Sequence, residues 1–271
     1  MRLVPVMTGA PDEIESPASR DGDAGRITVL IDGVTKVFPS GSGSVTALDD
    51  ISLTVRQGEF VCLLGASGCG KSTLLNLVAG LEAPTAGSVH RAGEPSFMFQ
   101  DAALFPWLSV EQNVELPLKL KKVPKAERRR RVAELLDMVQ LGAFARRQPH
   151  ELSGGMRQRA ALARALARDA EVLLMDEPFG ALDAMTRDVL HDELERIWKT
   201  TGQTVLFVTH NVREAARLGD RIILLTSRPG RVAEEFPVHI PRPRRIEDPD
   251  VAALAGVVTA RLREEVARHG R

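Results

Sequence analysis

Gly65-Ala66-Ser67-Gly68-Cys69-Gly70-Lys71-Ser72-Thr73 is the stretch that decides the fold, because it matches the phosphate-loop pattern G-x-x-x-x-G-K-[ST]. The apolar run Phe60–Leu64 before it predicts a buried strand, and Thr73–Ala79 after it predicts a helix. Glycines let the backbone N–H groups of such a loop turn toward phosphate oxygens, and the helix N-terminus adds partial positive charge. Lys71 can reach the β- and γ-phosphates, and the Ser72 hydroxyl can ligate Mg²⁺. The sequence therefore predicts an α/β protein that binds a nucleotide.

Composition and charge limit the classes of function. The 271 residues suffice for one large domain, or for a domain with an insertion. Lys+Arg and Asp+Glu both number 36, so the overall charge does not indicate a nucleic-acid partner. Cys62 and Cys69 have neither metal-binding spacing nor a plausible disulfide role, which favours a reduced, cytosolic compartment. No apolar run approaches the roughly 18 residues of a membrane span, so a membrane role must come through a partner.

Strand signals precede the phosphate loop. Ile27–Ile31 and Gly33–Phe38 each predict a strand, Val45–Val55 alternates apolar with polar residues, and Pro39–Ser44 predicts a loop. Because antiparallel strands then precede a unit that alternates strands and helices, we expect an α/β core with a β edge. Residues 1–25 are rich in Pro, Gly, Ser, Asp and Glu without periodicity, which predicts a disordered tail.

The segment 101–151 has a different character and predicts a helical insertion in the α/β core. Apolar side chains recur at helical spacing within Val132–Val139. The run Arg128–Arg131 suggests either a nucleic-acid contact or a solvated helix face. We favour the solvated face, since acids elsewhere balance the charge.

Two further strands end on polar side chains. The apolar strand within Glu171–Pro178 ends on Asp176 and Glu177, and Thr204–Thr209 is followed by His210. Uncompensated carboxylates are costly to bury, and Mg²⁺ offers a physical reason for Asp176. Glu177 then points elsewhere and could activate water, although a plain helix-terminus carboxylate is the alternative. Ligands of open α/β sheets bind at the carboxyl ends of strands, which favours a functional over a structural His210.

The segment Leu152–Arg159 begins another helix with an open N-terminus. Ser153 is a good N-cap, and Gly154 and Gly155 leave the first N–H groups accessible to an anion. A simple capped helix is the alternative. Later helices show apolar positions at helical spacing. These positions are Met185, Val189, Leu190, Leu194, Ile197 and Trp198 in one helix, and Leu254, Val258, Leu262 and Val266 in a C-terminal helix of unknown use.

Taken together, these motifs resemble the ATP-binding cassette family over about Ile27 to Val238, and Leu152-Ser153-Gly154-Gly155 is the most specific of them. The resemblance implies a RecA-like phosphate-loop NTPase core with an antiparallel β subdomain and a helical subdomain inserted at about 101–155. It implies a cassette over 26–240, followed by a linker and C-terminal helix over 241–271.

The resemblance also implies roles for individual residues. ATP would lie between the phosphate loop of one chain and the signature motif of a second, with Glu177 as general base and His210 on the γ-phosphate. Gln100 would contact Mg²⁺ or the attacking water, and Asp183 would link the two sites. Phe38 stands where the family usually stacks a tyrosine on adenine. The implied nucleotide contacts are Phe38, Gly65, Ser67, Gly68, Cys69, Gly70, Lys71, Ser72, Thr73, Ser153, Gly154, Gly155 and Asp183, and the implied Mg²⁺ ligands are Ser72, Gln100 and Asp176.

Within that family, the stretches Phe99–Asp101, Leu104–Trp107, Gly180–Asp183 and Arg228–Arg231 most resemble importer ATPases of the nitrate, sulfonate and taurine class. The expected partners are an integral membrane permease, indirectly an extracytoplasmic solute-binding protein, and a second ATPase chain that is either a copy or a paralogue. The expected location is the cytoplasmic face of the inner membrane, with no nucleic acid. A non-transport or exporter ATPase of the same family is the alternative, and the signature motif disfavours a small-molecule kinase.

Overall fold

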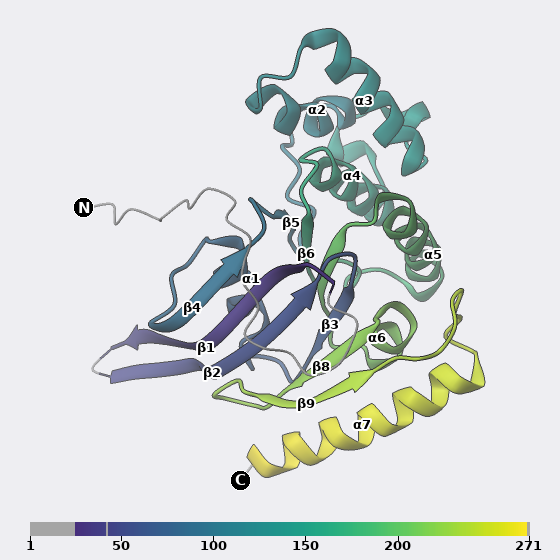
Figure 1. Ribbon diagram of the computed structural model, residues 1–271. Coiled ribbons are helices and arrows are strands. Elements are labelled where there is room, and N and C mark those ends of the chain that lie inside the picture. The colour runs from purple at the N-terminus through teal and green to yellow at the C-terminus, as the bar shows by residue number, and fades with distance from the viewer. Residues whose placement is uncertain (1–24, 42, 270–271) are drawn as a thin grey trace.

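A central six-stranded sheet forms the middle layer of the computed structural model, which describes residues 25–41 and 43–269 (Figure 1). Its strand order is β5-β6-β7-β3-β8-β9, and all neighbouring pairs are parallel except β8 with β9. Apart from Gly25, the predicted disordered tail lies outside the described residues. The strands are β3 (Phe60–Leu64), β5 (Ser96–Met98), β6 (Val172–Asp176), β7 (Thr204–Val208), β8 (Arg221–Leu225) and β9 (Val232–Pro237).

Both faces of this sheet are buried, which explains why its inner strands are apolar throughout. Phe60, Cys62 and Leu64 of β3 pack into a core shared with helices of the insertion and the C-terminal half. Val61 and Leu63 alternate with them and pack on the opposite face, against the helix that follows the phosphate loop and the second sheet. The phosphate loop therefore leaves the sheet from a strand held on both sides.

The second sheet is antiparallel, as predicted, with the order β2-β1-β4. The two strands predicted over 27–31 and 33–38 are one strand, β1 (Ile27–Ser40), and β2 (Gly43–Arg56) follows after a turn shorter than the predicted loop. Gly33 has φ +56° and lies at a register shift, so the interruption is a bulge rather than a strand end. The third strand is β4 (Ala86–Arg91).

The helices cover the sheet and form a projecting insertion, at the top of Figure 1, from α2 and α3. The predicted apolar face within Val132–Val139 is confirmed by Val132, Leu135, Leu136 and Val139, which are all buried. The helices are α1 (Lys71–Ala79), α2 (Val110–Leu120), α3 (Lys125–Met138), α4 (Gly154–Leu166), α5 (Ala184–Thr201), α6 (Val212–Leu218) and α7 (Pro249–His269), with 3₁₀ turns at Gly142–Phe144 and Pro149–Glu151.

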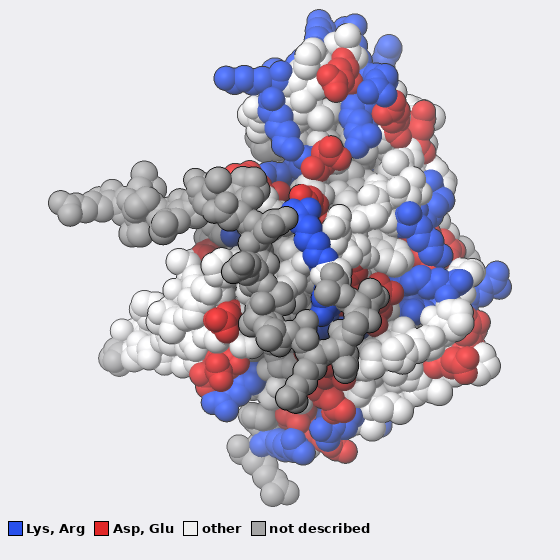
Figure 2. All heavy atoms as spheres, viewed as in Figure 1, with Lys and Arg blue, Asp and Glu red and all other residues white. Residues whose placement is uncertain are grey.

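The arginine run at the start of α3 is part of a solvated surface. Arg128 forms an ion pair with Glu115 at 2.9 Å, and Arg130 pairs with Glu134 one turn along α3 at 2.7 Å. Lys and Arg side chains gather at the top of the view in Figure 2, with acidic side chains among them. This arrangement agrees with the solvated helix face favoured from the sequence.

The apolar face predicted for α5 is correct in its middle and wrong at its start. Leu190, Leu194 and Ile197 are buried, whereas Met185 is 81% exposed and Val189 is 45% exposed. Met185 and Val189 therefore lie on the solvent side of α5, and periodicity alone does not show where an apolar stripe leaves the core.

The C-terminal helix packs on the core through three of the four predicted apolar positions, Leu254, Val258 and Leu262. Val251, Ala255 and Val258 are buried in the same cluster as the sheet, whereas Val266 is 46% exposed. α7 also contacts α6. No helix in the described ranges is long and apolar enough to cross a membrane.

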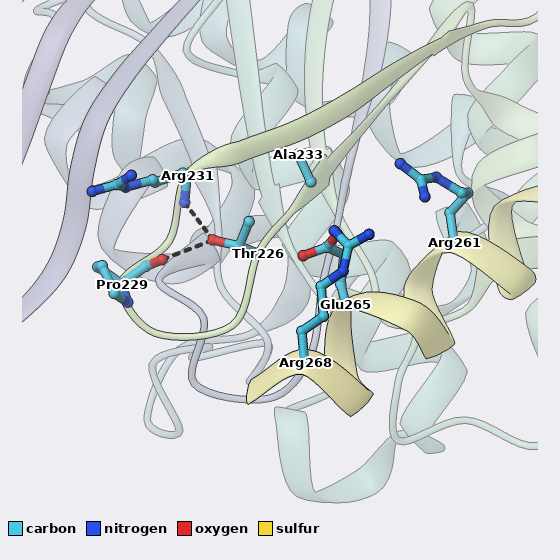
Figure 3. Close-up of a pocket in the computed structure, with 7 residues that line it drawn as sticks. All are labelled: Thr226, Pro229, Arg231, Ala233, Arg261, Glu265 and Arg268. Carbon is cyan, nitrogen blue, oxygen red and sulfur yellow. Dashed lines mark hydrogen bonds and ion pairs between the residues drawn. The ribbon is translucent and has the colours of Figure 1, made fainter. Parts of the chain in front are cut away.

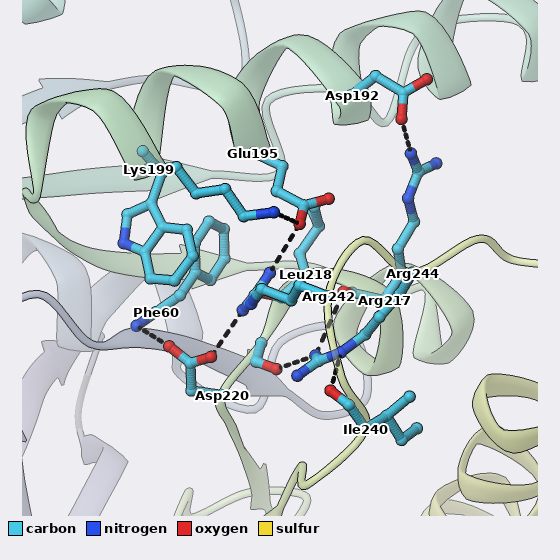
Figure 4. Close-up of polar contacts among 12 residues, drawn as sticks. Phe60, Asp192, Glu195, Lys199, Arg217, Leu218, Asp220, Ile240, Arg242 and Arg244 are labelled. Carbon is cyan, nitrogen blue, oxygen red and sulfur yellow. Dashed lines mark hydrogen bonds and ion pairs between the residues drawn. The ribbon is translucent and has the colours of Figure 1, made fainter.

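The segment before α7 is fixed to the end of α6 (Figure 4). Arg242 donates to Asp220 at 2.7 Å and lies over the Trp198 ring, 4.4 Å from its centroid. Arg244, only 3% exposed, donates to the carbonyl of Gly219 at 2.6 Å, so its guanidinium satisfies an acceptor at the end of α6. Despite its prolines, this segment is tied to the core.

Candidate functional site

The phosphate loop, Asp176, Glu177 and His210 follow three strands that are neighbours in the sheet. β6, β7 and β3 lie side by side and are parallel, so their carboxyl ends meet at one edge. Asp176 ends β6, His210 follows β7, and the phosphate loop with Lys71 follows β3. The fold thus brings together a cation, a carboxylate and an imidazole from positions up to 139 residues apart (210 − 71).

The phosphate loop has a closed conformation built on glycines. Gly68 and Gly70 have φ of +75° and +101°, which other residues rarely adopt. The Lys71 ammonium turns back over the loop and donates to the carbonyls of Gly65 at 2.8 Å and Ala66 at 3.0 Å, and its side chain is buried. The loop is therefore preformed, and its lysine satisfies its donors within the loop.

The cysteine of the loop contributes its backbone rather than its thiol. Cys69 is 1% exposed, and its Sγ atom would lie 2.6 Å from a Cβ placed on Gly65. Burial raises the pKa of this thiol, which therefore stays protonated. The Cys69 N–H donates to the Ala66 carbonyl at 3.2 Å inside the loop. A phosphate oxygen would therefore meet Cys69 through this N–H, in place of the Ala66 carbonyl.

Asp176 and Ser72 form a pair suited to one cation. Burial is the main cause that raises the pKa of Asp176, and a hydrogen bond from Ser72 acts in the opposite direction. No group of three or more His, Cys, Asp or Glu side chains in the described ranges could hold a metal ion. Mg²⁺ is usually bound through one or two carboxylates together with phosphates, so this donor set fits Mg²⁺ held jointly with a nucleotide.

Glu177 and His210 contact each other directly. Their Oε2 and Nδ1 atoms are 2.8 Å apart, and the His210 side chain is 62% exposed. Glu177 has φ +43°, an uncommon conformation for a residue with a side chain, so its carboxylate leaves the line of β6 and turns toward β7. The prediction that Glu177 points away from Asp176 is consistent with this geometry.

A buried network behind His210 was not predicted from the sequence. Thr209 and His191 both bond to the Glu214 carboxylate, with 2.5 Å between His191 Nε2 and Glu214 Oε1, and Arg217 lies 3.3 Å from His191 Nδ1. Because arginine only donates, Nδ1 accepts from Arg217, and Nε2 donates its hydrogen bond to the Glu214 carboxylate. The network fixes Thr209, the residue before His210. Its sequence signal was polar residues at core positions of α5 and α6, without any indication of their partners.

The signature motif lies at the start of α4 and faces outward. Ser153 is exposed and caps its own helix by accepting from the Met156 N–H at 3.3 Å. A Cβ on Gly155 would lie 2.6 Å from Cγ2 of Thr186, so glycine permits close packing of α4 on α5. Asp183 caps α5 by accepting from the Thr186 N–H at 3.0 Å. No described contact joins Ser153 to the phosphate loop of the same chain.

Two predicted residues lie at the margins of the site. Gln100 is exposed, and its described contact is through its carbonyl, which accepts from Gln158 at 3.0 Å. Phe38 is half-buried near the end of β1, and the Lys36 ammonium lies 4.8 Å from its ring centroid. The roles of the Gln100 amide and the Phe38 ring in nucleotide binding therefore stay predictions.

Comparison with known proteins decides the family. A family model described as ABC transporter matches residues 48–180. The uncharacterised ABC transporter ATP-binding protein MJ0412 of Methanocaldococcus jannaschii is 45% identical over 230 residues, which cover 82% of this chain and 86% of that protein. The chain belongs to the ABC transporter family. The family resemblance inferred from the motifs is confirmed.

This ABC cassette is also similar to proteins named for import. The taurine import ATP-binding protein TauB of Roseobacter denitrificans is 48% identical over 207 residues, covering 73% of this chain and 77% of that protein. The nitrate import ATP-binding protein NrtD of Synechococcus elongatus is 43% identical over 238 residues, covering 82% and 87%. Both relatives lie in the class indicated by the sequence motifs.

Solved cassettes share the fold. The dimeric structure of MJ0796, described as a bacterial ABC transporter cassette, superposes with a TM-score of 0.70 at 36% identity, covering 79% of this chain and all of that one. A post-hydrolysis state of the same cassette, bound to ADP and Pi, matches equally well. The predicted phosphate-loop NTPase fold is confirmed, and an ATPase of the ABC type is the activity that the family assigns.

Proposed function

We propose that this chain is the ATP-hydrolysing subunit of an ABC importer that takes up a small anion of the nitrate, sulfonate or taurine type. The observation that carries the proposal is the convergence of Lys71, Asp176, Glu177 and His210 at one sheet edge, in a cassette similar to nitrate and taurine import proteins. We propose residues 26–240 as the cassette, with its helical subdomain at about 101–155, and residues 241–271 as linker and C-terminal helix.

The phosphate loop, Ser72, Asp176 and Gln100 form the proposed binding site for ATP and Mg²⁺. When bound, ATP supplies the γ-phosphoryl group and Mg²⁺ neutralises its charge. Lys71 exchanges its two carbonyl acceptors for phosphate oxygens, and the Asp176 carboxylate gains a cation that offsets its burial. The Phe38 ring stacks on the adenine. The remaining nucleotide contacts are the sequence-predicted residues Gly65, Ser67, Gly68, Cys69, Gly70, Ser72 and Thr73.

Glu177 and His210 form the proposed catalytic pair. Glu177 accepts a proton from the attacking water, and the positive φ at this residue aims its carboxylate away from Asp176. His210 donates from Nδ1 to Glu177 Oε2 and holds that oxygen in place. In the imidazolium form, which carries a hydrogen on both ring nitrogens, Nε2 of this exposed side chain also donates to the γ-phosphate. Gln100 reports the state of this site to the membrane partner.

The outward-facing signature motif supports a second ATPase chain as partner. Ser153, Gly154 and Gly155 begin α4 with its N-terminus unpaired by this chain's own phosphate loop, and such an end attracts anions. We propose that two copies pair head to tail, with these residues on the γ-phosphate bound by the partner and Asp183 linking the two sites. The dimeric form of the similar cassette MJ0796 supports this arrangement.

The proposed permease contact lies beside Gln100. Phe99, Phe105 and Trp107 are 44%, 37% and 69% exposed, and large exposed aromatic side chains that cluster mark interaction surfaces. The Phe105 and Trp107 rings lie 5.5 Å apart. We propose that this surface docks on an integral membrane permease at the cytoplasmic face of the inner membrane, with a solute-binding protein on the other side and without nucleic acid.

Gentle extraction of the tagged chain from native membranes tests this function. We expect a multi-span membrane protein to co-purify in stoichiometric amount, and the reconstituted complex to couple ATP hydrolysis to uptake of nitrate, sulfonates or taurine. Trp107→Ala should release the membrane protein, whereas Leu81→Ala, which changes another exposed apolar residue, should not. Recovery with ribosomal or DNA-bound proteins alone would replace the importer by the non-transport alternative, and outward transport would indicate an exporter.

A further inference from the structure

The turn between β8 and β9 is closely bound to the phosphate loop. Residues 226–231 close on themselves, since the Thr226 hydroxyl donates to the Pro229 carbonyl at 2.8 Å and accepts from the Arg231 N–H at 2.9 Å. The Gly230 N–H donates to the Ala47 carbonyl at 2.9 Å, which joins the turn to β2.

Two contacts join this turn directly to the phosphate loop. Arg228 Nε donates to the Gly68 carbonyl at 2.9 Å, and its guanidinium lies over Gly68, where a Cβ would be 2.7 Å from Nη2. A Cβ on Gly230 would lie 2.2 Å from the Cys69 carbonyl oxygen, so only glycine permits this approach. The turn therefore covers two successive peptide groups of the loop.

We propose that Arg228 is a positioning residue for nucleotide binding, which acts by fixing the Gly68–Cys69 peptide of the phosphate loop. In a trans peptide the carbonyl and the following N–H point in opposite directions. Because Arg228 holds the Gly68 carbonyl outward, the Cys69 N–H points into the loop, where it now donates to Ala66. That orientation is the one an N–H group needs to meet a phosphate oxygen.

The charge of Arg228 acts in the same direction. Within the described residues its guanidinium has no carboxylate partner, whereas Arg231 of the same turn forms an ion pair with Asp49. An uncompensated guanidinium beside the loop adds to the positive potential that Lys71 supplies for an anion. Arg228 is exposed, so its replacement leaves the core intact.

On the opposite side of the turn from the phosphate loop lies α7 (Figure 3). A cavity of about 390 Å³ separates them, lined by Thr226, Pro229 and Arg231 of the turn. Arg261 of α7 forms an ion pair with Glu234 of β9 at 2.6 Å, so its charge is compensated, and we assign no ligand to the cavity. The helix whose use the sequence left open thus lies behind the turn that holds the phosphate loop.

The test compares Arg228→Gln with Arg228→Lys and with the matched control Arg231→Gln. The control removes the same charge from the same turn but makes no contact with the phosphate loop. Because this proposal rests on the nucleotide binding proposed above, two readouts are needed: the Kd for ATP, and hydrogen exchange of the amides at 66–70 without nucleotide. Thermal unfolding of each variant checks that it folds.

For Arg228→Gln we expect an ATP Kd raised about 10-fold, since a charged hydrogen bond is lost, with kcat of bound ATP little changed and faster exchange at 66–70. Arg228→Lys should restore most of the affinity, and Arg231→Gln should bind as wild type. Wild-type affinity and unchanged exchange in Arg228→Gln would overturn the proposal, as would an equal loss in the control. Failure of the wild-type chain to bind ATP would instead overturn the proposed function. The exchange data would then still test whether Arg228 fixes the Gly68–Cys69 peptide.

Discussion

The phosphate loop and the signature motif are both glycine-rich starts of helices, but they differ in the contacts that the rest of the chain makes with them. Around the phosphate loop, Lys71 donates to two loop carbonyls, Arg228 holds Gly68, and Gly230 lies against Cys69. Around the signature motif, Ser153 caps only its own helix and remains exposed. One region is completed by elements of the same chain and the other is not. The difference supports the proposal that a full site requires two chains.

The largest effect is expected from removing Glu177, the proposed base beside the phosphate loop. Glu177→Gln should lower ATP hydrolysis on the order of 10²–10⁴-fold, because an amide cannot take the proton from water. Nucleotide binding should persist, since the binding loop is untouched, and single-turnover hydrolysis together with ATP titration measures both. The control Glu171→Gln alters an exposed carboxylate before β6. Normal hydrolysis by the Glu177 variant would remove its role as base.

The signature motif offers a sharper test of the two-chain site. Ser153→Asp keeps a good N-cap but adds a negative charge where the partner's phosphate would lie, so hydrolysis should fall at least about 10-fold. ATP binding to the single chain should stay intact. Ser153→Asn is the matched control, because it keeps the cap without the charge.

Mixing this variant with Lys71→Ala then distinguishes a composite site from a self-contained one. Each variant alone places one defect in every site, whereas a mixed dimer gathers both defects in one site and leaves the other intact. Random pairing should therefore restore hydrolysis to about a quarter of the wild-type rate. No recovery in a mixture that is shown to contain mixed dimers would contradict the head-to-tail arrangement.

The smallest expected effect concerns the stability of the phosphate-loop region without nucleotide. Burial raises the pKa of Asp176 above its value in the unfolded chain, which is about 3.9. The protonated form therefore stabilises the fold fully below that pH. This contribution is lost as the pH rises through the pKa of the folded protein. Asp176→Asn should therefore have a higher Tm than wild type at neutral pH, with the difference vanishing near pH 4.

Thermal scans across pH measure this difference, with the exposed Asp169→Asn as control. Mg²⁺ and ATP should raise the Tm of wild type more than that of the Asp176 variant, because the cation offsets the buried charge only where the carboxylate is present. A Tm of the Asp176 variant that is lower at neutral pH would show that the carboxylate stabilises the empty site instead.

Two predictions from the sequence are wrong, and both concern packing. Met185 and Val189 follow a helical apolar pattern but are exposed, because the pattern does not show where α5 leaves the core. Gly33 marks a possible strand end in the sequence, and its positive φ instead forms a bulge within β1. In both cases the local sequence pattern is present, and packing against neighbouring elements determines the structure that it forms.

The sequence by itself determined the family and the fold class and predicted the residues of the nucleotide site, because phosphate chemistry demands particular residue types at fixed spacing. Only the tertiary structure showed that Glu177 contacts His210, that Thr209 and Glu214 stand behind it, and that Arg228 reaches Gly68 from 160 residues away. These contacts depend on strand order and on how turns meet across the sheet. A motif predicts which ligand one segment binds, whereas tertiary packing determines which distant residues contact that segment.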